Sequence, residues 1–323
     1  EGASFERSDL RGANFRRAKL SQANFDGADL RPGVIIGGED GSLARSGLVT
    51  QGRPAETDLS GADLEAASFE GAHLRQANFS GADLTHANLA NASAQGANFR
   101  GSILNGVNLT GTSLEGASIS PGTAALPPDI QTMLRDHALW IDTFGEEGAR
   151  ADLRKIDLRG QNLAGVYLSG ANLRGANLSG ANLSRALLIL ADLRDVDLSG
   201  ADIRRAEVNG ANFTGTNLQR ARLGEAKGDP MEIVGAAGKE TGQRQITRFA
   251  SARLRAAQLA GAQFRDADFE NADLLESDWE GAKLARTNFA GADLSGAVFR
   301  RTDLAEANLS GATLKGARFD FAN

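Results

Sequence analysis

The chain has 323 residues, of which 41% are apolar and 24% are charged, and its formal net charge is −6. This mild acidity excludes a protein that binds nucleic acid through bulk positive charge. The absence of cysteine excludes disulfides and thiolate metal sites, and no apolar run approaches the ~18 residues of a membrane span. A composition with 39 Gly, 6 Pro and one Tyr is typical of internal repeats.

A large apolar residue recurs every five positions along most of the chain, with a small residue two places before it. The block Ala176-Asn177-Leu178-Ser179-Gly180 states the unit: Ala, Asp or Asn, Leu or Phe, then two small or polar residues. A helix would rotate successive centres by about 140°, and a flat strand would expose alternate ones, so neither buries this period. The centres form four series: Phe5 to Leu30, Leu59 to Ile119, Leu153 to Leu223 and Phe249 to Phe319.

A chain that turns a corner after each unit can point every centre inward, and four units then make a square coil of about 20 residues. Residues 20 positions apart should therefore stack, as Phe79 with Phe99, or Trp279 with Phe299 and Phe319. This pattern resembles the pentapeptide-repeat family. The resemblance implies an all-β solenoid, a right-handed quadrilateral parallel β-helix. The interruptions add one inserted α-helix and two loop insertions.

The first and third interruptions of the repeat lack a helical pattern. In residues 31–57, the apolar segments Val34–Ile36 and Leu48–Thr50 flank a glycine-rich turn, which predicts a small hairpin or a long loop. Residues 227–248 contain Asp229-Pro230 and several glycines, and we predict a loop there.

The second interruption, residues 120–150, predicts a helix. Pro127, Pro128 and Asp129 mark its start and Gly145 its end. An apolar stripe at helical spacing, with Trp140 nearby, indicates that the helix lies on an apolar surface. The stripe consists of Ile130, Met133, Leu134, Ile141 and Phe144.

The helix divides the repeats into two stretches whose registers differ. We predict two solenoid lobes, 1–119 and 151–323, with 120–150 as a helical insertion or linker. The alternative is one continuous rod with a helical excursion. Both termini lie inside the repeat, so we expect either a longer polypeptide or a rod whose end a partner covers. Phe319 and Phe321 are candidates for an end-to-end contact between two copies.

The sequence predicts no catalytic, cofactor or metal site. His73 and His86 fall on different faces of the square, and His137 lies on the apolar stripe of the helix, where packing is its expected role. The many Asp residues before centres alternate with Asn, which indicates a structural use: bonds to the backbone at the corners.

Two surface features break the repeat pattern. Arg154, Arg174 and Arg194 occupy the same slot in successive coils, a ladder that would bind phosphate or carboxylate groups. The alternative is a solvated ladder neutralised by acidic residues, namely Asp152, Asp192 and Asp195.

The second feature is an apolar run, Leu187-Leu188-Ile189-Leu190, in which only Leu188 should point inward. Tyr167 lies one coil before Leu187, so Tyr167, Leu187, Ile189 and Leu190 form a candidate protein-docking patch. The alternative is that the helix or an insertion covers them.

These features favour a non-enzymatic protein–protein interaction scaffold that acts through the solenoid surface and its insertions. Resemblance to family members of the fluoroquinolone-resistance type implies an alternative, a DNA-mimicking modulator of DNA gyrase. The mild acidity and the long insertions depart from that type. A third possibility is an effector or secretion-system component with a missing flanking domain. The resemblance favours a bacterial cytoplasmic protein, with secretion as the alternative, and another protein as partner.

Overall fold

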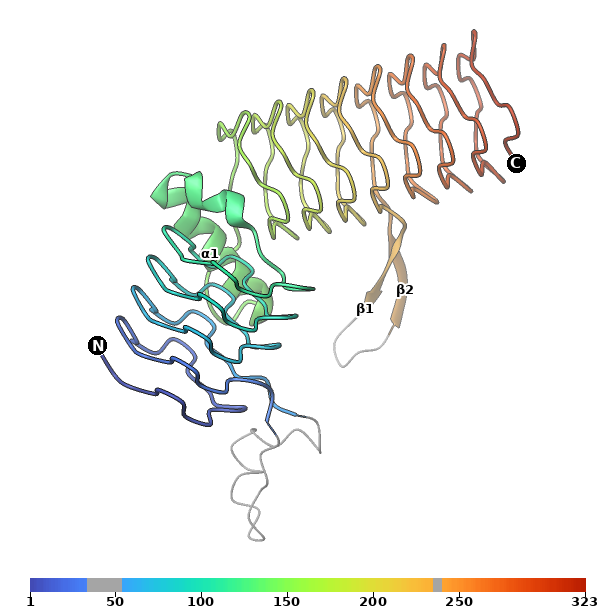
Figure 1. Cartoon of the computed structure of the whole chain (residues 1–323). Coiled ribbons are helices and arrows are strands. Elements are labelled where there is room, and N and C mark those ends of the chain that lie inside the picture. Colours follow the sequence, from blue (N-terminus) through green and yellow to red (C-terminus); the bar gives the residue numbers. More distant parts are fainter. Residues whose placement is uncertain (34–53, 235–239) are drawn as a thin grey trace. The chain divides into compact units, whose positions relative to one another are not determined.

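The computed structural model describes residues 1–33, 54–234 and 240–323. Contacts divide the chain into two compact units, Glu1–Ala149 and Arg150–Asn323, here called unit 1 and unit 2. Within each unit, residues 20 positions apart form parallel β-bridges, so that successive coils stack as rungs (Figure 1). This stacking confirms the 20-residue coil predicted from the five-residue period. The right-handed quadrilateral β-helix that the resemblance implies is also confirmed.

The repeat centres and the small residues before them fill the coils. Phe79, Phe99 and most other centres are fully buried. Rings 20 positions apart stack in columns, with centroids 4.9 Å apart for Phe79 and Phe99 and 6.0 Å apart for Trp279 and Phe299. Offset stacking of this kind adds about 0.5–1.5 kcal/mol per pair to the burial of the rings. The predicted stacking columns are thus confirmed.

Where an Asp or Asn precedes a centre, it shapes the corner that follows. Its side-chain oxygen accepts the backbone N–H two residues on, as Asn98 does from Arg100 (3.1 Å) and Asp197 from Ser199 (3.0 Å). The residue that closes the corner adopts a left-handed conformation, such as Gly180 with φ +65°. Because Gly pays little for a positive φ, it is abundant at this position. The high content of Gly, Asp and Asn in the chain therefore follows from the geometry of these corners.

The first insertion leaves one coil of unit 1 and returns to the same stack. Asn14 pairs with Asp58, a separation of 44 residues instead of 20, so 24 residues are added. Across this gap the rings of Phe25 and Phe69 still stack at 4.7 Å. The hairpin or loop expected for Val34–Ile36 and Leu48–Thr50 lies outside the described residues.

Unit 1 ends in a 3-10 helix, η2 (Pro121–Ala125), followed by α1 (Pro128–Asp142). Pro128 opens α1, and the Gly145 N–H donates to the Trp140 carbonyl (2.7 Å) where the chain leaves the helix. The start and end expected from the sequence therefore hold. Phe144, expected in the apolar stripe, is 98% exposed, because it lies past the last turn with its own φ at +53°.

Helix α1 packs on a strip of glycines from three successive coils of unit 1 (Figure 1). A Cβ built on Gly101 would lie 2.4 Å from Ala138 Cβ, and one built on Gly81 would lie 2.8 Å from Leu139 Cγ. The bare corners let the helix approach the coils closely. Its apolar face is therefore used within unit 1. The buried residues of α1 are Ile130, Gln131, Leu134, His137, Ala138 and Leu139.

The second insertion, predicted as a loop, is a β-hairpin in unit 2. Strand β1 (Met231–Val234) pairs antiparallel with β2 (Glu240–Gln245), and the hairpin projects from the stack (Figure 1). Because β2 reads Glu-Thr-Gly-Gln-Arg-Gln, it lacks the apolar alternation that signals a strand. Polar contacts fix the base: the buried Thr247 hydroxyl accepts the Gly210 N–H (3.0 Å), and Asp229 pairs with Arg265 (2.6 Å).

Candidate functional site

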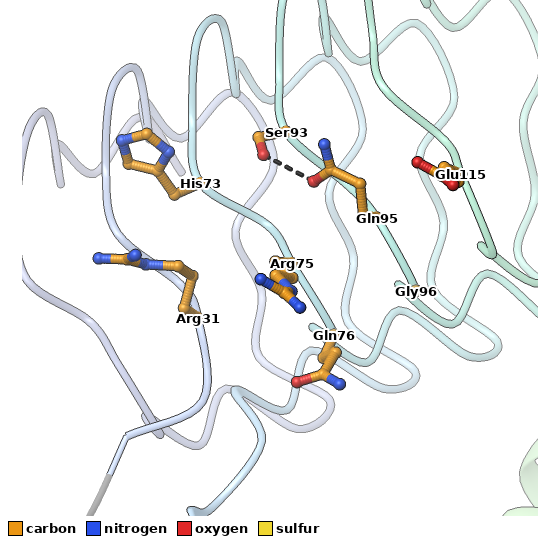
Figure 2. Close-up of a pocket in the computed structure, with 8 residues that line it drawn as sticks. All are labelled: Arg31, His73, Arg75, Gln76, Ser93, Gln95, Gly96 and Glu115. Atoms are coloured by element: carbon orange, nitrogen blue, oxygen red, sulfur yellow. Dashed lines mark hydrogen bonds between the residues drawn. The ribbon is translucent and has the colours of Figure 1, made fainter.

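A polar trough of about 640 Å³ runs along one side of unit 1. Its lining residues flank the repeat centres of four successive coils, so the coil stacking alone places them in a row (Figure 2). The first insertion leaves the stack beside Arg31, at one end of the trough. The trough is lined by Arg31, His73, Arg75, Gln76, Ser93, Gln95, Gly96 and Glu115.

Some polar groups of the trough already have partners. Arg31 makes a forked ion pair with Asp29, at 2.9 and 2.7 Å, and this pair holds the pKa of Asp29 below its ordinary value. Gln95 accepts a hydrogen bond from the Ser93 hydroxyl (2.7 Å) and donates one to Ser113 Oγ (2.8 Å), as Figure 2 shows for the first contact. The middle of the trough is therefore neutral and held in place.

Two charges in the trough have no such partner. Among the described residues, neither the Arg75 guanidinium nor the Glu115 carboxylate forms an ion pair. In Figure 2 Arg75 lies beside Arg31 and His73, whereas Glu115 lies at the far end beyond Gln95. The trough thus has an uncompensated positive charge two coils away from an uncompensated negative charge.

Sequence reasoning missed this trough. It weighed His73 only as a metal ligand and ended the first series of repeats before the insertion. The signal was present in the residues that directly follow the centres: Arg31, Arg75, Gln95 and Glu115. Their spacing is 20 residues once the 24 inserted positions are removed.

The residues of the predicted apolar patch lie together on one side of unit 2. Leu187 pairs with Tyr167 in the neighbouring coil, Leu188 is fully buried, and Leu190 is 47% exposed. The base of the β1–β2 hairpin adjoins them, because a Cβ on Gly210 would lie 2.8 Å from both Leu190 Cδ2 and Gln245 Cγ. Ile233 of β1 is another exposed apolar side chain, at 38%. We call Tyr167, Leu187, Ile189 and Leu190, with the hairpin base, the apolar corner.

The arginines of the predicted ladder each face a carboxylate. Arg154 pairs with Asp152 and Arg194 with Asp192, both at 2.6 Å, and each pair lowers the pKa of its carboxyl. Arg174 follows Asn172 instead of an Asp, and it turns to Asp195 at 3.3 Å. Anion binding by the ladder stays a prediction, and an incoming anion would have to displace these carboxylates.

The remaining candidate residues lie at the last coil and around the histidines. Phe319 stacks on Phe299 at 5.0 Å, and Phe321 is 84% exposed. Their role in an end-to-end contact stays a prediction. Within the described residues, no group of three or more His, Asp or Glu is placed to hold a metal ion. Across residues 1–33, 54–234 and 240–323, no helix is long and apolar enough to cross a membrane.

The fold and its repeats define this chain as a solenoid of five-residue units. The chain matches the profile of pentapeptide repeats in eight segments that together span most of its length, and it belongs to the pentapeptide-repeat family. The matched segments are 1–31, 57–93, 82–120, 151–188, 191–227, 247–284, 262–301 and 282–320.

Solved structures of pentapeptide-repeat proteins are similar to this chain. A trypsin-treated variant of QnrB1, a plasmid-mediated fluoroquinolone resistance protein, is 21% identical, with 51% of this chain and 85% of that chain covered and a TM-score of 0.36. HetL, from the cyanobacterium Nostoc sp. strain PCC 7120, is involved in heterocyst differentiation regulation. It is 20% identical, with 97% of this chain and 89% of that chain covered and a TM-score of 0.26. A search of curated proteins gives no match.

Proposed function

We propose that this protein is a non-enzymatic scaffold that binds another protein through the apolar corner of unit 2. The observation that carries the proposal is the outward, half-exposed Leu190 in a run of four apolar residues, beside a projecting hairpin. Elsewhere on the described solenoid surface, apolar side chains that are at least partly exposed, such as Leu275 and Leu314, do not stand in a run of this kind. A contiguous apolar patch with a polar rim is typical of a protein-interaction site.

The apolar corner is left partly open to a partner, because Leu190 is 47% exposed although the hairpin base adjoins it. Helix α1, which the sequence offered as a cover, has its buried face on the glycine strip of unit 1. The hairpin is held at its base by Thr247 and by the ion pair between Asp229 and Arg265. A held hairpin presents its surface to a partner at little ordering cost.

The test replaces Leu187 and Leu190 by Ser in the full chain, with Leu275→Ser as the matched control. Leu275 is an outward, partly exposed leucine in another part of unit 2. A photo-crosslinker at position 233 would capture a partner from an extract of the source organism, and the purified partner would then be titrated. We expect the double variant to lose at least about tenfold in affinity with an unchanged melting temperature, because apolar anchors dominate interface energies.

Two results would overturn this proposal. One is a double variant that unfolds earlier or becomes sensitive to protease, since the corner would then serve internal packing. The other is a purified partner that binds the double variant and the Leu275→Ser control equally well.

A further inference from the structure

The polar trough of unit 1 has a charge pattern that the repeat alone does not require. Along the residues that follow the centres, the Arg31–Asp29 pair is neutral, Arg75 is positive, Gln95 is neutral and Glu115 is negative. Within this row of four residues, Arg75 and Glu115 carry charges that form no ion pair among the described residues, whereas Arg31 is paired with Asp29. A ligand that matches the trough must therefore carry one anionic and one cationic group.

The coil stacking fixes how far apart those groups must be. Arg75 and Glu115 are two coils apart, and stacked coils rise by about 4.8 Å each, which gives roughly 10 Å along the stack. A peptide in the polyproline II conformation has three residues per turn and rises about 3.1 Å per residue. Residues i and i+3 of such a peptide therefore lie on one side, about 9 Å apart.

We propose that the trough binds an extended segment of a partner protein that carries an acidic residue and a basic residue three positions apart. The acidic side chain pairs with Arg75, and His73 and the Gln76 amide lie beside it. The basic side chain pairs with Glu115. The inference rests on the proposed function only in taking the ligand to be a protein.

The same charges argue against a nucleic acid in the trough. Arg31 already forms a fork with Asp29, so Arg75 is the one uncommitted guanidinium among the described lining residues. Phosphate backbones need several cations in a row. Glu115 would also repel the next phosphate along the stack. A segment with both signs of charge meets neither difficulty.

The test uses short peptides with a neutral fluorophore and the full chain at low salt. The probe contains Asp-Pro-Pro-Lys between proline flanks, which hold the polyproline II conformation. Companion peptides replace Asp by Asn, replace Lys by Gln, or shorten the spacing to Asp-Pro-Lys. Fluorescence anisotropy gives the dissociation constant for each peptide. The protein variants are Arg75→Gln, Glu115→Gln and, as a matched control, Arg11→Gln, because Arg11 holds the same repeat position but pairs with Asp9 at 2.7 Å.

We expect Arg75→Gln to weaken binding of the probe by about fivefold, the upper range for one exposed ion pair, and to leave the Asn peptide unaffected. Glu115→Gln should likewise weaken binding of the probe by about fivefold and leave the peptide with Gln in place of Lys unaffected. Arg11→Gln should bind the probe like the wild type. The Asp-Pro-Lys peptide should bind more weakly than the probe.

Three results would overturn the inference. They are no measurable binding of the probe, equal losses for Arg75→Gln and Arg11→Gln, or affinities that ignore both the spacing and the charges of the peptides. The Leu187 and Leu190 double variant should bind the probe normally. The proposal for the trough and the proposal for the apolar corner can therefore be refuted independently of each other.

Discussion

The packing of α1 on the glycine strip predicts that one added methyl group will disturb unit 1 in a way that depends on position. In Gly101→Ala, the new Cβ would lie 2.4 Å from Ala138 Cβ and 2.9 Å from the Leu134 carbonyl oxygen. The residue also has φ +64°, so the alanine pays about 1–2 kcal/mol for a left-handed conformation. Overpacking adds about 1–3 kcal/mol, or the helix shifts away.

Gly71 provides the matched control for this substitution. Its φ is +65°, it holds the same position in its repeat, and a Cβ built on it meets nothing within 4 Å. Gly71→Ala therefore pays the backbone cost alone. The difference between the two variants, about 1–3 kcal/mol, measures the clash with α1. A third variant, Gly101→Ala with Ala138→Gly, removes the opposing methyl and should recover part of the loss.

Urea unfolding followed by tryptophan emission can measure these differences. The chain has two tryptophans, so Trp279→Phe leaves Trp140 on α1 as the reporter of unit 1. We expect Gly101→Ala to unfold at lower urea than Gly71→Ala, with redder Trp140 emission before unfolding if α1 has moved. Equal free energies of unfolding for the two alanine variants, with unchanged emission, would refute the packing described for α1.

Two further predictions concern buried polar groups. Ser277→Ala should destabilise unit 2 by about 1–3 kcal/mol, because the buried Trp279 indole N–H donates to Ser277 Oγ (2.8 Å) and would lose its acceptor. Thermal unfolding should show this cost shrink in a Trp279→Phe background, where only the hydrogen bond from the Ser277 hydroxyl to the Leu274 carbonyl (2.7 Å) is lost. Burial raises the pKa of Asp142 above its ordinary value of 3.8, so its carboxyl contributes stability at lower pH that is lost as pH rises through the folded pKa. Asp142→Asn should therefore make unit 1 more stable than the wild type at pH 7. Urea unfolding should show that this difference in the free energy of unfolding is smaller at pH 4. A difference that grows toward pH 4 would contradict the raised pKa.

The fold could be predicted from the sequence because one geometric rule covers nearly every residue. A period of five cannot be buried by a helix or a flat strand, so the coil and its 20-residue stacking follow from the repeat alone. The start of α1 at Pro128 and the end of the helix before Gly145 were also predictable, because proline and glycine mark helix ends locally in the sequence. The pairing of Phe25 with Phe69 was not predictable, because it depends on the insertion returning to the stack it left.

The candidate functional surface was harder to predict, because it depends on what surrounds each side chain. Leu190 could be identified because it breaks the repeat pattern. The trough was missed although several of its residues share one repeat position, because Arg75 and Glu115 are ordinary repeat residues and the sequence does not show which neighbouring charges are paired. The hairpin beside the apolar corner pairs polar strands, for which the sequence contains no periodic signal.

The pairing of charges within single repeats distinguishes this solenoid surface from a uniformly acidic one. In repeats that read Asp-Leu-Arg, the two charged residues flank one centre and form a fork across it. Asp9 with Arg11 shows this at 2.7 Å, and the hydrogen bonds from Arg11 lower the pKa of Asp9 to about 2. Asp157 pairs with Arg159 in the same way, also at 2.7 Å. Such forks reduce the negative field of the solenoid surface, whereas a duplex backbone presents an unbroken row of negative charges.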